Sequence, residues 1–182
     1  MWDPNASIQE KQKMEQYMKE KILETFNLFA TDKKGYVDKK EIPYIMRYLG
    51  KFPSEAQVSK TILPQIEEDE PSESIKYQKF EPFMIQVLKS NEYDPDDTDT
   101  LLAAFRQLDE EKKGYIEIDT LKQRLTTMGI QFRPLEIEDF IRFATNGDPN
   151  ATVIYYEDYI LRLQFFIEKH MESVTKQYNP EK

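Results

Sequence analysis

With 182 residues, the chain is long enough for one compact domain or for two small lobes that each have a modest core. Eleven Phe and eleven Tyr supply large apolar side chains, so the composition excludes a disordered chain despite a mean hydropathy of -0.73. The net charge of -9 excludes general affinity for nucleic acid, because phosphate groups would be repelled, and it favours basic partners.

The first half of the chain predicts four helices, because apolar residues repeat there every three or four positions. A Gly at position 50 ends the second helix, and a capping box that begins at Ser54 opens the third. The apolar stripes are, in chain order, Met18, Ile22, Phe26 and Phe29; Ile42, Ile45, Met46 and Leu49; Val58, Ile62 and Ile66; and Phe80, Phe83, Met84, Val87 and Leu88.

The second half predicts four more helices, after a polar stretch rich in helix-breaking residues. Their stripes are Leu101, Phe105 and Leu108; Leu121, Leu125 and Met128; Ile137, Phe140, Ile141 and Ala144 after Pro134; and Tyr156, Tyr159, Ile160, Leu163 and Ile167. We therefore expect an N-terminal lobe over 1–90 with an extension at 1–12, a linker at 91–97, and a C-terminal lobe over 98–182 with an extension at 168–182.

The chain carries few of the residues that catalysis requires. It has no Cys and a single His, His170, so it has neither a thiolate nucleophile nor a His-based dyad or metal triad. The N-terminus lacks the apolar core of a signal peptide, and no apolar run approaches the roughly 18 residues of a membrane span. We expect a soluble intracellular protein with no catalytic residues, no cofactor and no membrane partner.

An internal repeat is the most specific pattern in the chain. The segment Asp32–Asp38 recurs as Glu111–Glu117, with the two glycines, Gly35 and Gly114, 79 residues apart. A second regularity accompanies the repeat, because an apolar residue in each copy has an apolar counterpart 38 residues later. These pairs are Val37 with Ile75 and Ile116 with Ile154.

These residues resemble the EF-hand family, and specifically its calmodulin-like members with four hands. In that family a Gly at loop position 6 makes a sharp turn, as Gly35 and Gly114 would, and the residue at position 8 pairs with its counterpart in the neighbouring loop. The resemblance implies an all-α fold of two EF-hand-pair lobes, with four helix–loop–helix units and short two-residue β ladders between paired loops.

The calcium ligands are largely absent from the first and third loops. An EF-hand loop supplies oxygen atoms from positions 1, 3, 5, 7 and 9 and from a bidentate Glu at position 12. The first loop retains Asp32, Asp38 and Glu41 at positions 3, 9 and 12, but it has Ala30 at position 1 and Lys34 at position 5. The third loop has Lys113 at position 5 and Thr120 at position 12, although it retains three carboxylates, and these are the weak metal candidates Asp109, Glu111 and Glu117.

The second and fourth loops depart further from the family pattern. Relative to their position-8 residues, both are too long, and they contain Pro71 and Pro149 respectively. The acidic run Glu67–Glu70 is predicted to be a solvated turn. We therefore expect no calcium cofactor, and the alternative is weak binding at the third loop.

The lysines at loop position 5 suggest a hypothesis about the missing ion. An ammonium group at Lys34, near Asp32, or at Lys113, near Asp109 and Glu111, would partly replace a bound cation. The alternative is that both side chains point into water.

Within the superfamily, three stretches resemble the EF-hand subunits of the nexin–dynein regulatory complex of cilia. They are Ile66–Pro71, Ile75–Met84 and Asp148–Pro149 leading to Ile154–Ile160. This resemblance implies a structural adaptor in the axoneme, a cytoskeletal location, and partners among the other subunits, such as a helix or a coiled coil. The alternatives are a myosin-type light chain that clamps an IQ helix and a weak calcium sensor.

A calmodulin-like lobe binds an amphipathic helix in a groove between its own helices. Residues that line such a groove have the same spacing as ordinary core residues, so both interpretations stay open. The candidate partner-binding residues are Phe26, Phe29, Met46, Leu49, Phe83, Met84 and Leu88 in the first lobe, and Phe105, Leu108, Leu125, Met128, Phe140, Ile160 and Leu163 in the second.

Overall fold

The computed structural model describes residues 7–30, 35–70, 72–129 and 131–175 of the chain. Two compact units make up the fold, the first from Met1–Pro95 with Lys169–Lys182 and the second from Asp96–Glu168. The break at Pro95 lies inside the expected linker, whereas Lys169–Lys182 is grouped with the first unit. The predicted fold class is confirmed, since both units are mainly helical and each contains one two-stranded antiparallel sheet.

The helices of the first unit begin where the sequence supplies capping groups. Ser7 caps α1, because its hydroxyl oxygen accepts a hydrogen bond from the Glu10 amide, and Ser54 caps α3 in the same way. The elements are α1 (Ile8–Phe29), β1 (Tyr36–Asp38), the 3₁₀ turn η1 (Lys39–Glu41), α2 (Ile42–Tyr48), α3 (Glu55–Gln57), the π turn η2 (Val58–Ile62), α4 (Leu63–Ile66), β2 (Ser74–Lys76) and α5 (Tyr77–Lys89).

The third predicted helix contains a π turn, which the sequence pattern does not indicate. Pro64 is the second residue after this turn and has no amide hydrogen for the usual α-helical bond to Lys60. A π turn contains more residues than an α turn, so it accommodates this missing bond. It also keeps Val58, Ile62 and Ile66 on one buried face.

The second unit repeats the order of helix, strand, helix. Its first helix is capped by Asp97, whose carboxylate accepts a hydrogen bond from the Thr100 amide. Its elements are α6 (Thr98–Leu108), β3 (Tyr115–Glu117), α7 (Ile118–Thr127), α8 (Pro134–Ala144), β4 (Val153–Tyr155) and α9 (Tyr156–Thr175), of which the part up to Glu168 belongs to this unit. None of the described helices in either unit is long and apolar enough to cross a membrane.

Each unit joins its two loops through a short antiparallel ladder. In the first unit Val37 lies opposite Ile75, and in the second Ile116 lies opposite Ile154. All four side chains are buried, so each ladder presents an apolar pair to the core of its unit. The predicted pairing is therefore confirmed, although the strands are three residues long.

Both repeat glycines have the backbone conformation that the turn requires. Gly35 has a φ of 77° and Gly114 a φ of 80°, in the left-handed region that L-residues seldom adopt. Apart from the neighbouring residues in the chain, no atom of the described residues lies within 4 Å of the position where a Cβ would be added at either glycine. The conformation of the backbone, and not space for a side chain, therefore favours Gly at these positions.

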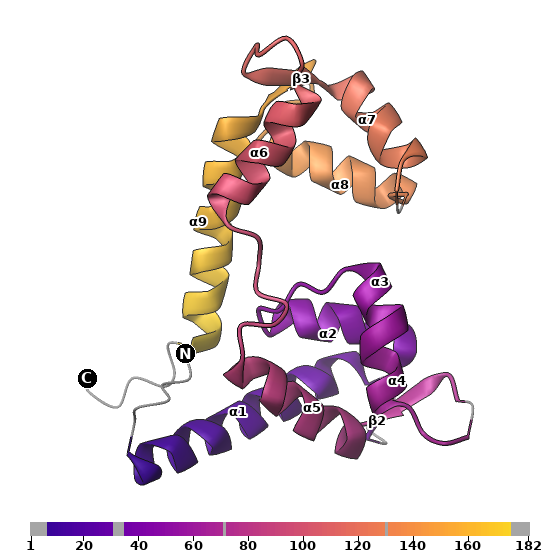
Figure 1. Cartoon of the computed structure of the whole chain (residues 1–182), viewed down its shortest axis with the longest axis vertical. Helices are drawn as coiled ribbons and strands as arrows, with labels where there is room; N and C mark the ends of the chain where they lie inside the picture. Colours follow the sequence, from indigo (N-terminus) through magenta and orange to yellow (C-terminus); the bar gives the residue numbers. More distant parts are fainter. Residues whose placement is uncertain (1–6, 31–34, 71, 130, 176–182) are drawn as a thin grey trace. The chain divides into compact units, whose positions relative to one another are not determined.

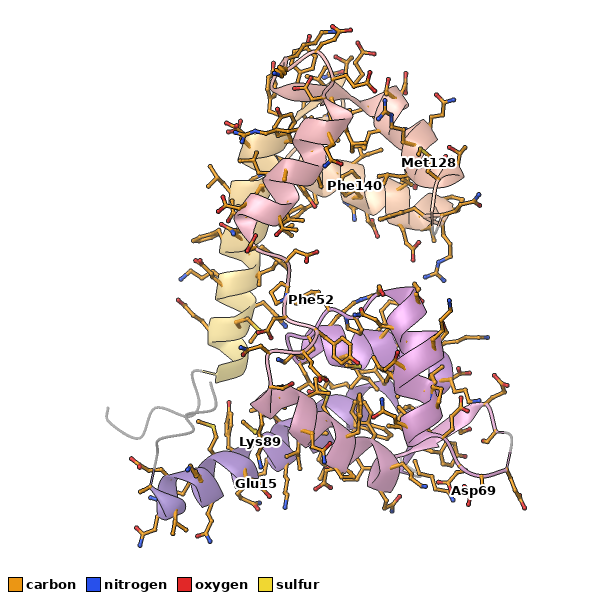
Figure 2. All side chains as sticks on the ribbon, viewed as in Figure 1. Glu15, Phe52, Asp69, Lys89, Met128 and Phe140 are labelled. Atoms are coloured by element: carbon orange, nitrogen blue, oxygen red, sulfur yellow. The ribbon has the colours of Figure 1, made fainter. Side chains whose placement is uncertain are left out.

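The first unit has a fully enclosed core. Figure 1 shows α1 and α5 packed side by side in this unit. Phe26 of α1 and Phe80 of α5 are both completely buried, with their ring centroids 5.6 Å apart. At the edge of the same contact Lys89 Nζ lies 2.6 Å from Glu15 Oε2, and the ammonium group lowers the pKa of the Glu15 carboxyl (Figure 2).

We predict that Phe26→Ala lowers the free energy of unfolding of the first unit by about 3–5 kcal/mol, because it leaves a cavity in a closed core. Leu28→Ala is the matched control on the same helix, since Leu28 is 68% exposed, and it should change stability by less than about 0.5 kcal/mol. Urea unfolding followed by far-UV circular dichroism measures both variants. Equal effects would contradict the described packing.

Candidate functional site

The first residue of the third loop is held by groups of the protein itself. Asp109 is 6% exposed, and its carboxylate accepts hydrogen bonds from the amides of Lys113 at 2.9 Å and Gly114 at 2.8 Å. The hydroxyl of Tyr156, which follows β4, also donates to Asp109 at 3.0 Å. Burial raises the pKa of Asp109, but the two amides and this hydroxyl outweigh burial, so the pKa lies below its ordinary value.

Lys113 contacts a different carboxylate of the same loop. Its Nζ lies 2.6 Å from Glu111 Oε2, with the two side chains 41% and 72% exposed. A hydrogen bond from Lys113 to Glu111 raises the pKa of this lysine. The pair lies in solvent at the surface of the loop and does not occupy its centre. Lys34 and Asp32, the corresponding residues of the first loop, lie outside the described residues.

The third loop does not fit a calcium ion. Thr120 replaces the bidentate Glu, and Lys113 places a positive charge at a ligand position. In the described part of the first loop, Asp38 accepts a hydrogen bond from the Lys40 amide and so caps η1. Among the described residues, no group of three or more His, Cys, Asp or Glu side chains is arranged to hold a metal ion.

Acidic residues of the second loop pair with lysines beside the ladder. Lys39 Nζ lies 2.9 Å from Glu67, and Lys76 Nζ lies 3.5 Å from Glu68. Figure 2 shows Asp69 at the outer edge of this loop, pointing away from the ribbon. The acidic run is therefore partly paired and partly solvated.

A guanidinium group lies beside the fourth loop. Arg162 of α9 lines a cleft of about 320 Å³ together with Asp148 and Asp158, among other residues. One Nη of Arg162 donates a hydrogen bond to the carbonyl oxygen of Ala144, the last residue of α8. A permanently charged side chain thus lies close to the fourth loop. It supplies a hydrogen-bond donor to a carbonyl group at the end of α8, the helix that leads into this loop.

The candidate residues of the first unit lie inside the core or against it. Phe26, Met46, Leu49 and Met84 are at most 2% exposed. The other three candidates are half-buried and pack against the same core; they are Phe29, Phe83 and Leu88. As the unit stands, its apolar groove is closed.

The second unit leaves its apolar residues far less covered. No residue of α6 is buried, and Met128 at the end of α7 is 65% exposed. Ile160 is buried, whereas the remaining candidates are half-buried around it, namely Phe105, Leu108, Leu125, Phe140 and Leu163. Figure 2 places Phe140 on α8 and Met128 at the end of α7, so this apolar face extends over several helices.

Three aromatic residues extend this face beyond the candidates from the sequence. Phe132, Phe143 and Phe166 are 39%, 36% and 58% exposed. Phe132 contacts Phe140 at 6.4 Å between ring centroids, and Phe143 contacts Phe166 at 5.7 Å. Helical spacing indicates two of them, because Phe143 is three residues after Phe140 and Phe166 three after Leu163.

Most of the net negative charge of the chain lies in the unit that carries this face. Between Asp96 and Glu168 there are fifteen Asp or Glu residues and eight Lys or Arg residues. An apolar surface in an acidic environment favours an amphipathic segment with basic residues at its edges. We give the name apolar face to the surface formed by nine of these residues, namely Phe105, Leu108, Leu125, Met128, Phe132, Phe140, Phe143, Leu163 and Phe166.

Helix–loop–helix units joined in pairs by ladders, with a left-handed Gly in the first loop of each pair, define a calmodulin-like EF-hand protein. No protein-family model matches the chain. Over 140 residues the chain is 36% identical to Dynein regulatory complex protein 8 of Mus musculus, a match that covers 77% of the chain and 84% of the mouse protein. The chain therefore belongs to the dynein regulatory complex protein 8 family of calmodulin-like EF-hand proteins.

Other relatives agree with this assignment. The human protein of the same name is 37% identical over 106 residues, which cover 58% of the chain and 39% of the human protein, so the match spans less than half of that relative. A calmodulin-like protein of Dictyostelium discoideum is 30% identical, with 69% of the chain and 79% of that protein covered.

Two solved structures share the fold. The regulatory domain of Physarum polycephalum myosin II has a TM-score of 0.63 at 24% identity and covers 80% of the chain and 93% of its own. Mlc1p bound to IQ2 of Myo2p, a class V myosin, has a TM-score of 0.57 at 20% identity and covers 77% and 94%. At these identities the similarity shows the fold alone.

We predict that Asp109→Asn changes how the stability of the second unit depends on pH. Because the folded pKa of Asp109 is lowered, its stabilising effect is present above the unfolded pKa of about 3.9 and is lost as pH falls through the folded pKa. The variant should be less stable than the natural chain at pH 7, and the difference should shrink in acid. Urea midpoints between about pH 7 and pH 3 measure this, with the exposed Glu138→Gln as control. A constant difference would contradict the prediction.

We also predict that Lys113→Asp combined with Thr120→Glu creates a calcium site in the third loop. The two changes restore oxygen ligands at positions 5 and 12 of a loop that already has the required Gly turn. Calorimetry should give a dissociation constant of roughly 10⁻⁷ to 10⁻⁵ M for the double variant. Lys113→Asp alone, which lacks the bidentate ligand, is the control. Equally tight binding by the natural chain would show that our assessment of the loops is wrong.

Proposed function

We propose that the chain is a non-enzymatic, calmodulin-like adaptor subunit of the axonemal nexin–dynein regulatory complex, and that it binds helical partner segments constitutively. The observation that carries the proposal is the 36% identity to Dynein regulatory complex protein 8 over 84% of the mouse protein. The proposed location is the axoneme of cilia or flagella, within the cytoskeleton. The proposed partners are other subunits of the complex, through a helix or a coiled coil.

The apolar face supplies the physical basis for this role. Half-buried residues such as Phe105, Leu125 and Phe140 lose their remaining contact with water when a helix covers them, which favours association. The acidic surroundings favour a helix with Lys or Arg at its edges. Neither a nucleic acid nor a membrane is proposed as a partner.

The chemistry of the third loop supports constitutive binding. A calcium-regulated hand opens its helices when the ion binds. In the third loop Asp109 already has amide and hydroxyl partners, and position 5, a ligand position in calcium-binding hands, is occupied by Lys113, which pairs with Glu111. These features of the third loop disfavour a role as a calcium sensor.

A myosin-type light chain is the other candidate. It is suggested by the fold shared with Mlc1p, which is bound to IQ2 of Myo2p in its own structure. This candidate predicts a myosin heavy chain as the partner, whereas the adaptor role predicts subunits of the regulatory complex.

Crosslinking mass spectrometry on isolated cilia that carry the tagged chain tests the proposal. We expect crosslinks from α7, α8 and α9 to helical segments of the regulatory complex. Met128→Asp should reduce recovery of the chain with the complex roughly tenfold or more, because it places a charge on an exposed part of the apolar face.

Leu161→Asp provides a matched control, since Leu161 is 64% exposed, close to the 65% of Met128, and is not among the residues of the apolar face. It should leave recovery unchanged. Recovery of a myosin heavy chain without enrichment in axonemes would favour the light-chain role instead. Equal losses in the two variants would contradict binding through the apolar face.

A further inference from the structure

The segment after α5 folds back onto the turn between α2 and α3 of the first unit. Lys51, in this turn, has a side chain only 7% exposed. Its Nζ lies 2.6 Å from Asp94 Oδ1 and 2.7 Å from the carbonyl oxygen of Ser90. The amide of Phe52 donates a further hydrogen bond to the carbonyl oxygen of Tyr93. Residues 90–94 are thus tied to the turn by both backbone and side-chain bonds.

Tyr93 adds an apolar contact to these bonds. It packs against the buried core of the first unit, and burial raises the pKa of its hydroxyl. Its φ of 58° lies in the left-handed region, which a residue with a large side chain adopts only when its surroundings hold it there. The segment is therefore a fixed part of the first unit and not a free linker.

These bonds connect the two parts that must separate if the unit is to open. When an EF-hand pair opens, the angle between the helices of each hand changes. Here the end of α5 is bound to the turn that joins the first hand to the second. Opening would separate Lys51 from Asp94 and leave a buried ammonium group without its partner, which is strongly unfavourable.

A cleft beside this segment has a different character from the apolar face. Its volume is about 610 Å³, and its walls are mixed in character. Polar side chains contribute to them together with the apolar Phe83 and Val87; the polar and aromatic members are Gln57, Thr61, Gln65, Gln86, Ser90, Glu92 and Tyr93. Polar groups interrupt the apolar ones in this lining, so the cleft offers an amphipathic helix a less continuous apolar surface than the apolar face does.

The second unit lacks an equivalent connection in its described residues. No Lys or Arg among them is buried, and Met128, next to the turn between α7 and α8, is exposed. Its apolar residues are only partly covered, in contrast to those of the first unit. The unit in which Lys51 bonds to residues 90–94 is therefore also the unit whose apolar residues are covered.

We propose that residues 90–94 form a strap that holds the first unit closed, so that one chain binds one partner helix, through its second unit. The strap itself is independent of the proposed function. The stoichiometry rests on that function, because it assumes that the apolar face binds helices.

The strap is tested on the full chain with Lys51→Met, which removes the ammonium group and retains much of the length of the side chain. Lys76→Met is the control, because Lys76 is 59% exposed and its ion pair with Glu68 measures 3.5 Å. Hydrogen exchange followed by mass spectrometry should become roughly tenfold faster or more around Leu49–Phe52 and α4 in Lys51→Met only. Asp94→Ala removes the exposed partner instead, and it replaces Lys51→Met as the test variant if Lys51→Met does not fold. It should accelerate hydrogen exchange in the same region.

The stoichiometry is tested by calorimetry with a synthetic amphipathic peptide of leucine and lysine. We expect one peptide per natural chain and a second peptide on the strap variants. Two peptides per natural chain, or exchange in the strap variants equal to that of Lys76→Met, would overturn the strap. If the natural chain binds no peptide, the proposed helix binding and its stoichiometry are wrong, and hydrogen exchange still decides whether the strap exists.

Discussion

The ladder between paired loops is the constraint on which each unit depends. Val37 with Ile75, and Ile116 with Ile154, fix where one hand lies against the other, because each pair is buried and its strands exchange backbone hydrogen bonds. A calcium-binding hand also fixes its loop with the ion. Here the third loop is held by amides and the Tyr156 hydroxyl around Asp109, which organise it without a cation.

The same frame is completed differently in the two units. In the first, large side chains such as Phe26 and Phe80 fill a closed core, and the tie at Lys51 joins the end of α5 to the turn between the hands. In the second, Phe105 and Phe140 remain partly exposed among a clear excess of acidic residues. If the proposed function is correct, one unit serves as a stable body and the other as the binding surface.

The features of the fold that could be predicted are those that depend on residues close together in the sequence. The spacing of apolar residues predicted the helices, and the recurring Gly and position-8 residues predicted the turns and the register of both ladders. Contacts between residues far apart in the sequence could not be predicted in this way. The sequence shows a hydroxyl at Tyr156 and an ammonium group at Lys51, but it does not show which residue either group contacts. The π turn also went unpredicted, since Pro64 is compatible with several local geometries.

The candidate binding residues show the same limit. Phe26 and Met128 both belong to helical apolar stripes, yet Phe26 is completely buried and Met128 is 65% exposed. Periodicity reports which face of a helix is apolar and not how completely the neighbouring helices cover that face. How far the apolar face of a helix is buried depends on tertiary packing. In this respect the closed first unit differs from the partly open second unit.

Hydrogen exchange of the ladder amides, measured with EGTA and again with excess calcium, tests most directly whether the fold holds without a metal ion. If side-chain and backbone groups replace the ion, the amides of Val37, Ile75, Ile116 and Ile154 should be equally protected in both conditions. Ladders that exchange rapidly in EGTA and become protected only when calcium is added would contradict this view of the molecule.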